Sequence, residues 1–95
     1  MTGTSADSSA SHQTLKSYAL EVVAERSAEA LLRVLNPLQK LEITPQEVRS
    51  GRAPGGEGMF IEIQFDATPE RAGQVRRQVG SSILVQDAQL LSCSR

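Results

Sequence analysis

The sequence predicts an α+β domain whose elements follow the order strand, helix, strand, strand, helix, strand. Apolar and polar residues alternate along residues 16–24 and again along residues 59–65, a period typical of half-buried strands. Two other segments, opening at Ser27 and Thr68, begin with a helix-capping residue and carry apolar residues at helical spacing. Right-handed crossovers would place both helices on one face of a four-stranded antiparallel sheet, which predicts a ferredoxin-like βαββαβ sandwich.

The first strand and first helix are expected between residues 16 and 41. One strand face is apolar, with Tyr18, Leu20, Val22 and Ala24, and Glu21 lies on the other face. After the N-cap at Ser27, leucines recur at helical spacing, at Leu31, Leu35, Leu38 and Leu41. Pro37 lacks a backbone donor, so it predicts a kink near Asn36 or an early end of the helix.

A long hairpin and a second helix are expected next. Residues 43–52 predict an edge strand, because Pro45 cannot donate a ladder hydrogen bond, and the glycine-rich residues 53–58 form a flexible connection to the next strand. The second helix should end at Gly80. Its buried stripe is formed by Ala72, Val75 and Val79, and Val85, Ala88 and Leu90 give core contacts to a last strand over residues 84–93.

The chain length indicates one domain with a modest core. The 95 residues are 39% hydrophobic but only 3% aromatic, so the core is expected to be aliphatic, with Tyr18, Phe60 and Phe65 as its few large members. Residues 1–14, which include His12, are rich in small polar side chains and predict a disordered tail. The folded domain is therefore expected over residues 15–95.

Charge and cysteine content limit the possible partners. The net charge is -1 with dispersed Lys and Arg, which does not favour nucleic acid or an anionic membrane. No apolar run approaches the ~20 residues of a membrane-spanning helix. The single cysteine, Cys93, excludes an internal disulfide and is typical of a cytoplasmic protein.

The edge strand leaves backbone groups unpaired, so we expect a homodimer completed at that edge.

Other functions of this topology lack their usual residues. A metallochaperone needs two thiolates, and an RNA-binding module needs aromatic residues on its central strands, where the open faces instead carry Glu21, Glu62 and Gln64. Phe60 is the one candidate stacking residue, and a lone exposed phenylalanine more often marks a partner contact. An acylphosphatase-like enzyme would use an arginine after the first strand, where Arg26 lies, but no glycine-rich anion loop accompanies it.

The junction at residues 25–35, ERSAEALLRVL, resembles the strand-to-helix junction of ACT domains, the small regulatory modules of amino-acid metabolism. The resemblance extends over nearly all of residues 17–93. The short length and the ending formed by Val85, Ala88 and Leu90 resemble the short small subunits of acetolactate (acetohydroxyacid) synthase. This implies a regulatory subunit without catalytic residues, which binds and activates a catalytic subunit in branched-chain amino-acid biosynthesis.

The resemblance also implies where an effector would bind. In ACT domains that bind amino acids, a glycine in the junction lets the effector carboxylate approach the helix N-terminus. Here Ser27, Ala28 and Glu29 occupy that region, and the short synthase subunits also lack the glycine. A small amino acid would contact Arg26, Ser27, Ala28 and Glu29, with Gln46 from a second subunit.

No metal or cofactor is expected in this chain, since the resemblance implies that thiamine diphosphate, flavin and magnesium belong to the catalytic subunit. A stand-alone amino-acid sensor and an unrelated enzyme on the same fold are the alternatives.

Overall fold

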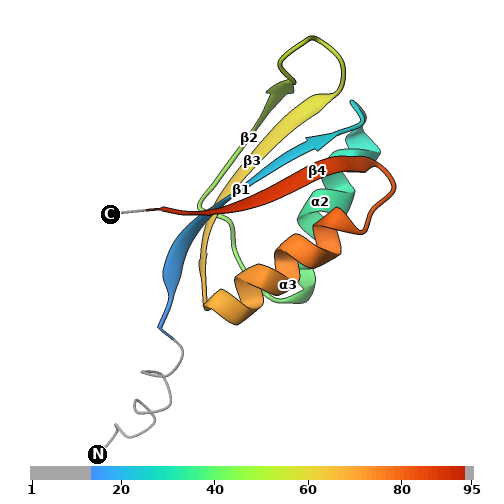
Figure 1. The fold of residues 1–95 in the computed structure, drawn as a ribbon. Helices are drawn as coiled ribbons and strands as arrows, with labels where there is room; N and C mark the ends of the chain where they lie inside the picture. Colours follow the sequence, from blue (N-terminus) through green and yellow to red (C-terminus); the bar gives the residue numbers. More distant parts are fainter. Residues whose placement is uncertain (1–13, 94–95) are drawn as a thin grey trace, which may run out of the picture.

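Two helices cover one face of a four-stranded antiparallel sheet in the computed structural model, which describes residues 14–93 (Figure 1). The strand order across the sheet is β2-β3-β1-β4. In chain order the elements are β1 (Lys16–Ala24), α2 (Ala28–Lys40), β2 (Glu47–Arg52), β3 (Met59–Ala67), α3 (Pro69–Gly80) and β4 (Val85–Ser92). The predicted ferredoxin-like βαββαβ fold is confirmed. The predicted tail over residues 1–14 lies, apart from Thr14, outside the described residues.

The core fills the space between the helices and the sheet. β1 and β3 pair along their full length, from Lys16 with Ala67 to Ala24 with Met59, so their inward side chains form continuous rows. The largest fully buried side chains are Phe65, Leu20, Leu38, Ile61, Ile63, Val22, Val34, Val75 and Val79. The rings of Tyr18 and Phe65 pack with centroids 6.0 Å apart. The expected aliphatic core is confirmed, except that Phe60 is half-buried on the opposite side of β3 from Ile61.

The prediction at Pro37 was a kink or an early end of the helix, and the early end is wrong because α2 continues to Lys40. The backbone N–H of Leu41 donates to the carbonyl of Pro37 at 3.1 Å and closes the last turn. Pro37 removes only one intrahelical bond, the one to the exposed Arg33, and its ring is buried beside Leu38. Burial of the ring near the helix end makes the proline tolerable.

None of the helices within residues 14–93 combines the length and the apolar composition that a membrane span requires.

The buried stripe of α2 differs in phase from the predicted leucine stripe. Ala30, Val34 and Leu38 are fully buried, whereas Leu31 and Leu35 are only partly buried against the core. Both stripes satisfy the helical period, because they lie next to each other on the helix surface. Ala30, Val34 and Leu38 face the core, and Leu31 and Leu35 pack at its margin.

Both edge strands are shorter than predicted. β2 begins at Glu47 rather than residue 43, because Pro45 has no N–H to donate and the N–H of Ile43 donates to the carbonyl of Leu38 at 2.9 Å. Every residue of β2 is exposed, including Val48. β4 covers Val85–Ser92 rather than 84–93, and its residues Val85, Ala88 and Leu90 pack against the core as predicted.

Candidate functional site

The β1–α2 junction contains four of the five predicted site residues, Arg26, Ser27, Ala28 and Glu29. The N–H of Glu25 donates to the carbonyl of Leu84 at 2.8 Å, which fixes the junction to the segment before β4. Ser27 has extended backbone angles, and its Oγ accepts the N–H of Ala30 at 3.1 Å. The predicted N-cap is therefore confirmed, and it leaves one fewer helix N–H for a ligand.

The charged side chains of the junction point along the surface of α2 or into solvent. Nη2 of Arg33 lies 3.0 Å from Oε2 of Glu29, an exposed i,i+4 ion pair. Arg26 and Ala28 are exposed. Glu29 also lines a hollow of about 370 Å³ on the outer side of α2, together with Leu32. Beside the Ser27 cap, the helix dipole favours an anion and the exposed Arg26 supplies a cation.

Gln46 lies at the other end of the sheet from the junction. Its Nε2 donates to Oδ2 of Asp66 at 2.8 Å. Asp66 pairs with Ser17 near the start of β1, whereas Arg26 follows the end of β1. The seven residue steps from Ser17 to Ala24 span roughly 24 Å at ~3.4 Å per residue. One chain therefore does not bring Gln46 to the other four residues, and a shared site would need a second copy.

The β2–β3 connection returns to the end of β1 in a way that the sequence did not reveal. Gly58 has φ 83°, and a Cβ built on it would lie 3.0 Å from the backbone oxygen of Ala24. Glycine lets the loop adopt this backbone conformation and approach the strand closely. Residues 53–58, predicted only as a flexible connection, thus contact the strand that leads into the junction. The three glycines at 55, 56 and 58 were the sequence feature from which such a close approach of the loop could have been predicted.

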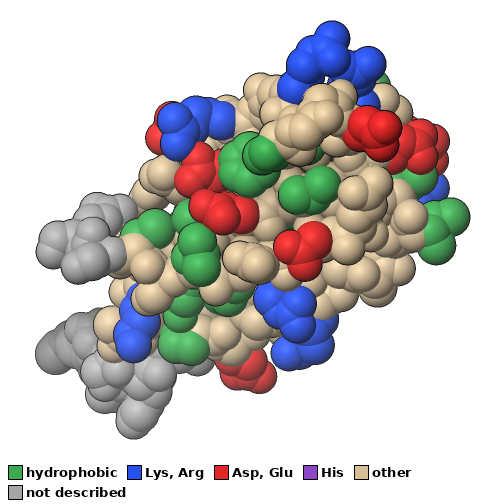
Figure 2. Space-filling model, turned by 45° about the horizontal axis from the view of Figure 1, so that its top comes forward, with side chains coloured by type: hydrophobic (Ala, Val, Ile, Leu, Met, Phe, Trp, Pro, Cys, Tyr) green, Lys and Arg blue, Asp and Glu red, His purple; other side chains and the backbone are tan. Residues whose placement is uncertain are grey.

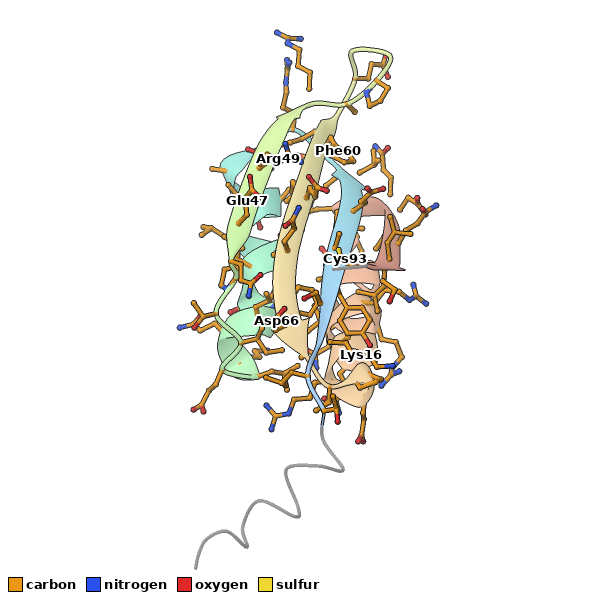
Figure 3. All side chains as sticks on the ribbon, turned by 90° about the vertical axis from the view of Figure 1, so that its left-hand side faces the viewer. Lys16, Glu47, Arg49, Phe60, Asp66 and Cys93 are labelled. Atoms are coloured by element: carbon orange, nitrogen blue, oxygen red, sulfur yellow. The ribbon has the colours of Figure 1, made fainter. Side chains whose placement is uncertain are left out.

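The second candidate surface is the side of the sheet that the helices do not cover, here called the open face. Figure 3 looks onto it, with Glu47 and Arg49 on β2, Phe60 and Asp66 on β3, and the helices behind the sheet. Strand alternation assigns it Ser17, Ala19, Glu21, Val23, Glu47, Arg49, Phe60, Glu62, Gln64, Asp66, Asp87, Gln89 and Leu91. The sequence placed Glu21, Glu62 and Gln64 on this face correctly.

A row of charged side chains crosses the middle of the open face. Glu62 lies between Arg49 of β2 and Glu21 of β1 in the strand register. Nε of Arg49 donates to Oε1 of Glu62 at 3.1 Å, and this bond raises the pKa of the Arg49 guanidinium above its ordinary value. Within residues 14–93, no group of three His, Cys, Asp or Glu side chains could hold a metal ion. The row is therefore an arrangement of acids around one arginine.

Replacement of Ser27 by alanine is expected to lower the free energy of unfolding by about 1 kcal/mol, because the Ala30 N–H loses its acceptor at the start of α2. Chemical denaturation followed by circular dichroism measures this loss. Ser27→Asp is the matched control, since aspartate also caps a helix and should retain most of the stability. Equal losses in both variants would contradict the capping role.

Comparisons with known proteins give structural likenesses only. No protein-family model matches the sequence, and no curated protein matches it either. An uncharacterized protein from Thermotoga maritima aligns with a TM-score of 0.69 and 14% identity, over 85% of this chain and 100% of its own. The C-terminal domain of the MgtC protein from Mycobacterium tuberculosis has a TM-score of 0.69 and 17% identity, over 83% of this chain and 88% of its own.

A third solved structure is larger than this chain. The regulatory subunit of aspartate kinase from Thermus thermophilus matches with a TM-score of 0.62 and 14% identity, over 83% of this chain. The match covers 54% of that subunit, so this chain spans about half of its length. Identities this low relate the folds alone. Together with the strand order, these likenesses establish that the chain has a ferredoxin-like fold.

Proposed function

We propose that this chain is an ACT-type regulatory domain, which sets the activity of another protein by binding to it. The observation that carries the proposal is the fold likeness to the aspartate kinase regulatory subunit from Thermus thermophilus, over 83% of this chain. The resemblance of residues 25–35 to an ACT junction supports the same class. On this proposal the domain catalyses no reaction and acts in the cytoplasm.

The partner we propose is the catalytic subunit of acetolactate synthase. Support comes from strand β4, where Val85, Ala88 and Leu90 pack against the core with the spacing noted in the sequence. The catalytic subunit would contribute thiamine diphosphate, flavin and magnesium, and this chain would contribute a binding surface. A partnership with a different enzyme would keep the regulatory class and change only the partner.

Sedimentation velocity tests the partnership. The chain and the catalytic subunit from the same organism are run alone and mixed, and the mixture is expected to contain a faster species that neither protein forms alone. Two unchanged boundaries in the mixture would contradict the partnership. The run on the free chain also tests the proposed homodimer, which the exposed edge strand β2 could form by pairing with a second copy. A monomer at high concentration would dismiss that dimer.

An effector site at the β1–α2 junction is the second part of the proposal. It rests on the capped N-terminus of α2 and on the exposed Arg26, which together favour a carboxylate. Calorimetry with valine, leucine and isoleucine is expected to give heat with at least one of them, which Arg26→Ala abolishes and Arg77→Ala, on α3, leaves intact. No heat with any of the three would dismiss the effector site without affecting the partner test.

A further inference from the structure

The two layers of the domain carry opposite charge. The open face bears five carboxylates and one guanidinium, those of Glu21, Glu47, Glu62, Asp66, Asp87 and Arg49. The two helices bear five cations and two carboxylates, those of Arg33, Lys40, Arg71, Arg76, Arg77, Glu29 and Glu70. The net charge of -1 hides this separation. The open face therefore attracts cationic groups and repels a second open face.

Two of the acids oppose each other at the centre of the face. Glu21 and Glu62 are direct cross-strand partners between β1 and β3. Like charges in this arrangement are unfavourable. Arg49 donates to Glu62, and on its other side Glu21 has Gln89, a neutral residue, as its partner on β4. Among the described residues, no cation forms an ion pair with Glu21. The row thus holds one more acid than base, in a position where an additional cation would be stabilised.

Apolar side chains lie on both sides of this charged row. In the adjacent row toward the β2–β3 connection, Val23 pairs with Phe60, and both are half-buried. In the row on the other side, Ala19 pairs with Leu91, which is 42% exposed. Figure 2 shows acidic side chains lying among hydrophobic ones on the face that it presents. The apolar side chains supply contact area, and the acids between them favour a partner that carries a complementary cation.

We propose that the open face docks a partner protein through a lysine or arginine with apolar neighbours, and that this cation lies over Glu21 and Glu62. The apolar neighbours of the cation pack on Phe60 and Val23. The inference deepens the proposed function, because it names the surface through which a regulatory domain would bind. It needs no identified enzyme, so it can be tested separately from the synthase.

A second copy fits this surface less well. Two open faces packed symmetrically would bring Glu21 and Glu62 of both chains together, with a single Arg49 from each side. The helix layer of another copy has the right charge, but such a head-to-tail contact joins two different surfaces and builds a ring or a growing chain rather than a symmetric pair. Concentration-dependent growth that Glu21→Gln abolishes would assign the face to a second copy and overturn the proposal.

Nuclear magnetic resonance with two matched peptides tests the proposal. The probe is a blocked hexapeptide in which arginine alternates with leucine, and its control has glutamate in place of each arginine. Titration of the labelled chain with the basic peptide is expected to shift amide signals around Glu21, Phe60 and Glu62, and the acidic peptide should shift none of them. Shifts confined to the helices, or equal shifts with both peptides, would overturn the proposal.

A charge-neutral variant separates a docking role from a structural one. Glu21→Gln is expected to weaken binding of the basic peptide about tenfold, the loss in affinity typical of one charge-assisted contact. The same substitution should raise the thermal midpoint of the free chain, because it removes the repulsion with Glu62. Glu70→Gln on α3 makes the same change in net charge and should leave peptide binding intact. Unchanged binding in Glu21→Gln, or equal weakening in both variants, would contradict the proposal.

Discussion

Replacement of Phe65 by alanine is expected to lower the free energy of unfolding by about 3–5 kcal/mol, the range measured when a buried aromatic side chain is truncated. The Phe65 side chain is fully buried in the middle of the core, and its ring packs against Tyr18 with centroids 6.0 Å apart. A domain of this size has a total stability of roughly 5–10 kcal/mol, so the variant should be close to unfolding. Urea denaturation followed by circular dichroism measures the loss.

Phe60 on the same strand is the matched control. It lies on the open face, where no helix covers it, and Phe60→Ala is expected to lower the free energy of unfolding by less than about 1 kcal/mol. A loss as large as that of Phe65→Ala would mean that the open face is covered in the free protein. That result would contradict the availability of this face to a partner.

Replacement of Gly58 by alanine is the second substitution with a large expected effect, a loss of about 2–4 kcal/mol in the free energy of unfolding. Two terms contribute to it. The positive φ of 83° is unfavourable for a residue with a Cβ. The Cβ would also lie 3.0 Å from the backbone oxygen of Ala24, which β1 holds in place. Denaturation with urea measures the sum of both terms.

Gly56 separates these two terms. It has a similar positive φ of 89°, but a Cβ there would meet nothing within 4 Å. Gly56→Ala should therefore lower the free energy of unfolding by only about 1 kcal/mol, the backbone contribution alone. If both variants lost the same amount, the close approach of the β2–β3 connection to Ala24 would not contribute to stability.

The regular elements could be predicted from the sequence because their signals are local. The alternation from Lys16 to Ala24 gave both ends of β1, since a period of two over nine residues is specific to a half-buried strand. The second helix was equally clear, with Thr68 as its N-cap and Pro69 as its first residue. Both signals depend only on residues within the element itself.

Other features depend on tertiary contacts and could not be predicted in the same way. Helix α2 runs through the buried Pro37 to Lys40, although proline alone predicts a kink or an earlier end. The face that α2 presents to the sheet was also ambiguous, because Ala30 and Val34 form a stripe next to the leucines. Only the fit of α2 against the sheet decides between two adjacent stripes.

The residues of the candidate sites also divide into those that local sequence patterns predict and those whose positions depend on tertiary contacts. The Ser27 cap and the outward position of Glu62 follow from local patterns. The opposition of Glu21 and Glu62 follows from the register of β1 and β3, which lie far apart in the chain. The separation of Gln46 from Arg26 likewise follows from the sheet order. A sequence pattern gives the face of a residue but not its neighbour on the next strand.

The activity of the acetolactate synthase catalytic subunit, titrated with this chain at fixed thiamine diphosphate, flavin and magnesium, tests regulation most directly. The proposed function predicts a saturable rise in activity. Glu21→Gln should require more protein for the same rise, and Glu70→Gln should behave like the unchanged chain. A flat titration, with no complex in sedimentation, would contradict the proposed partnership.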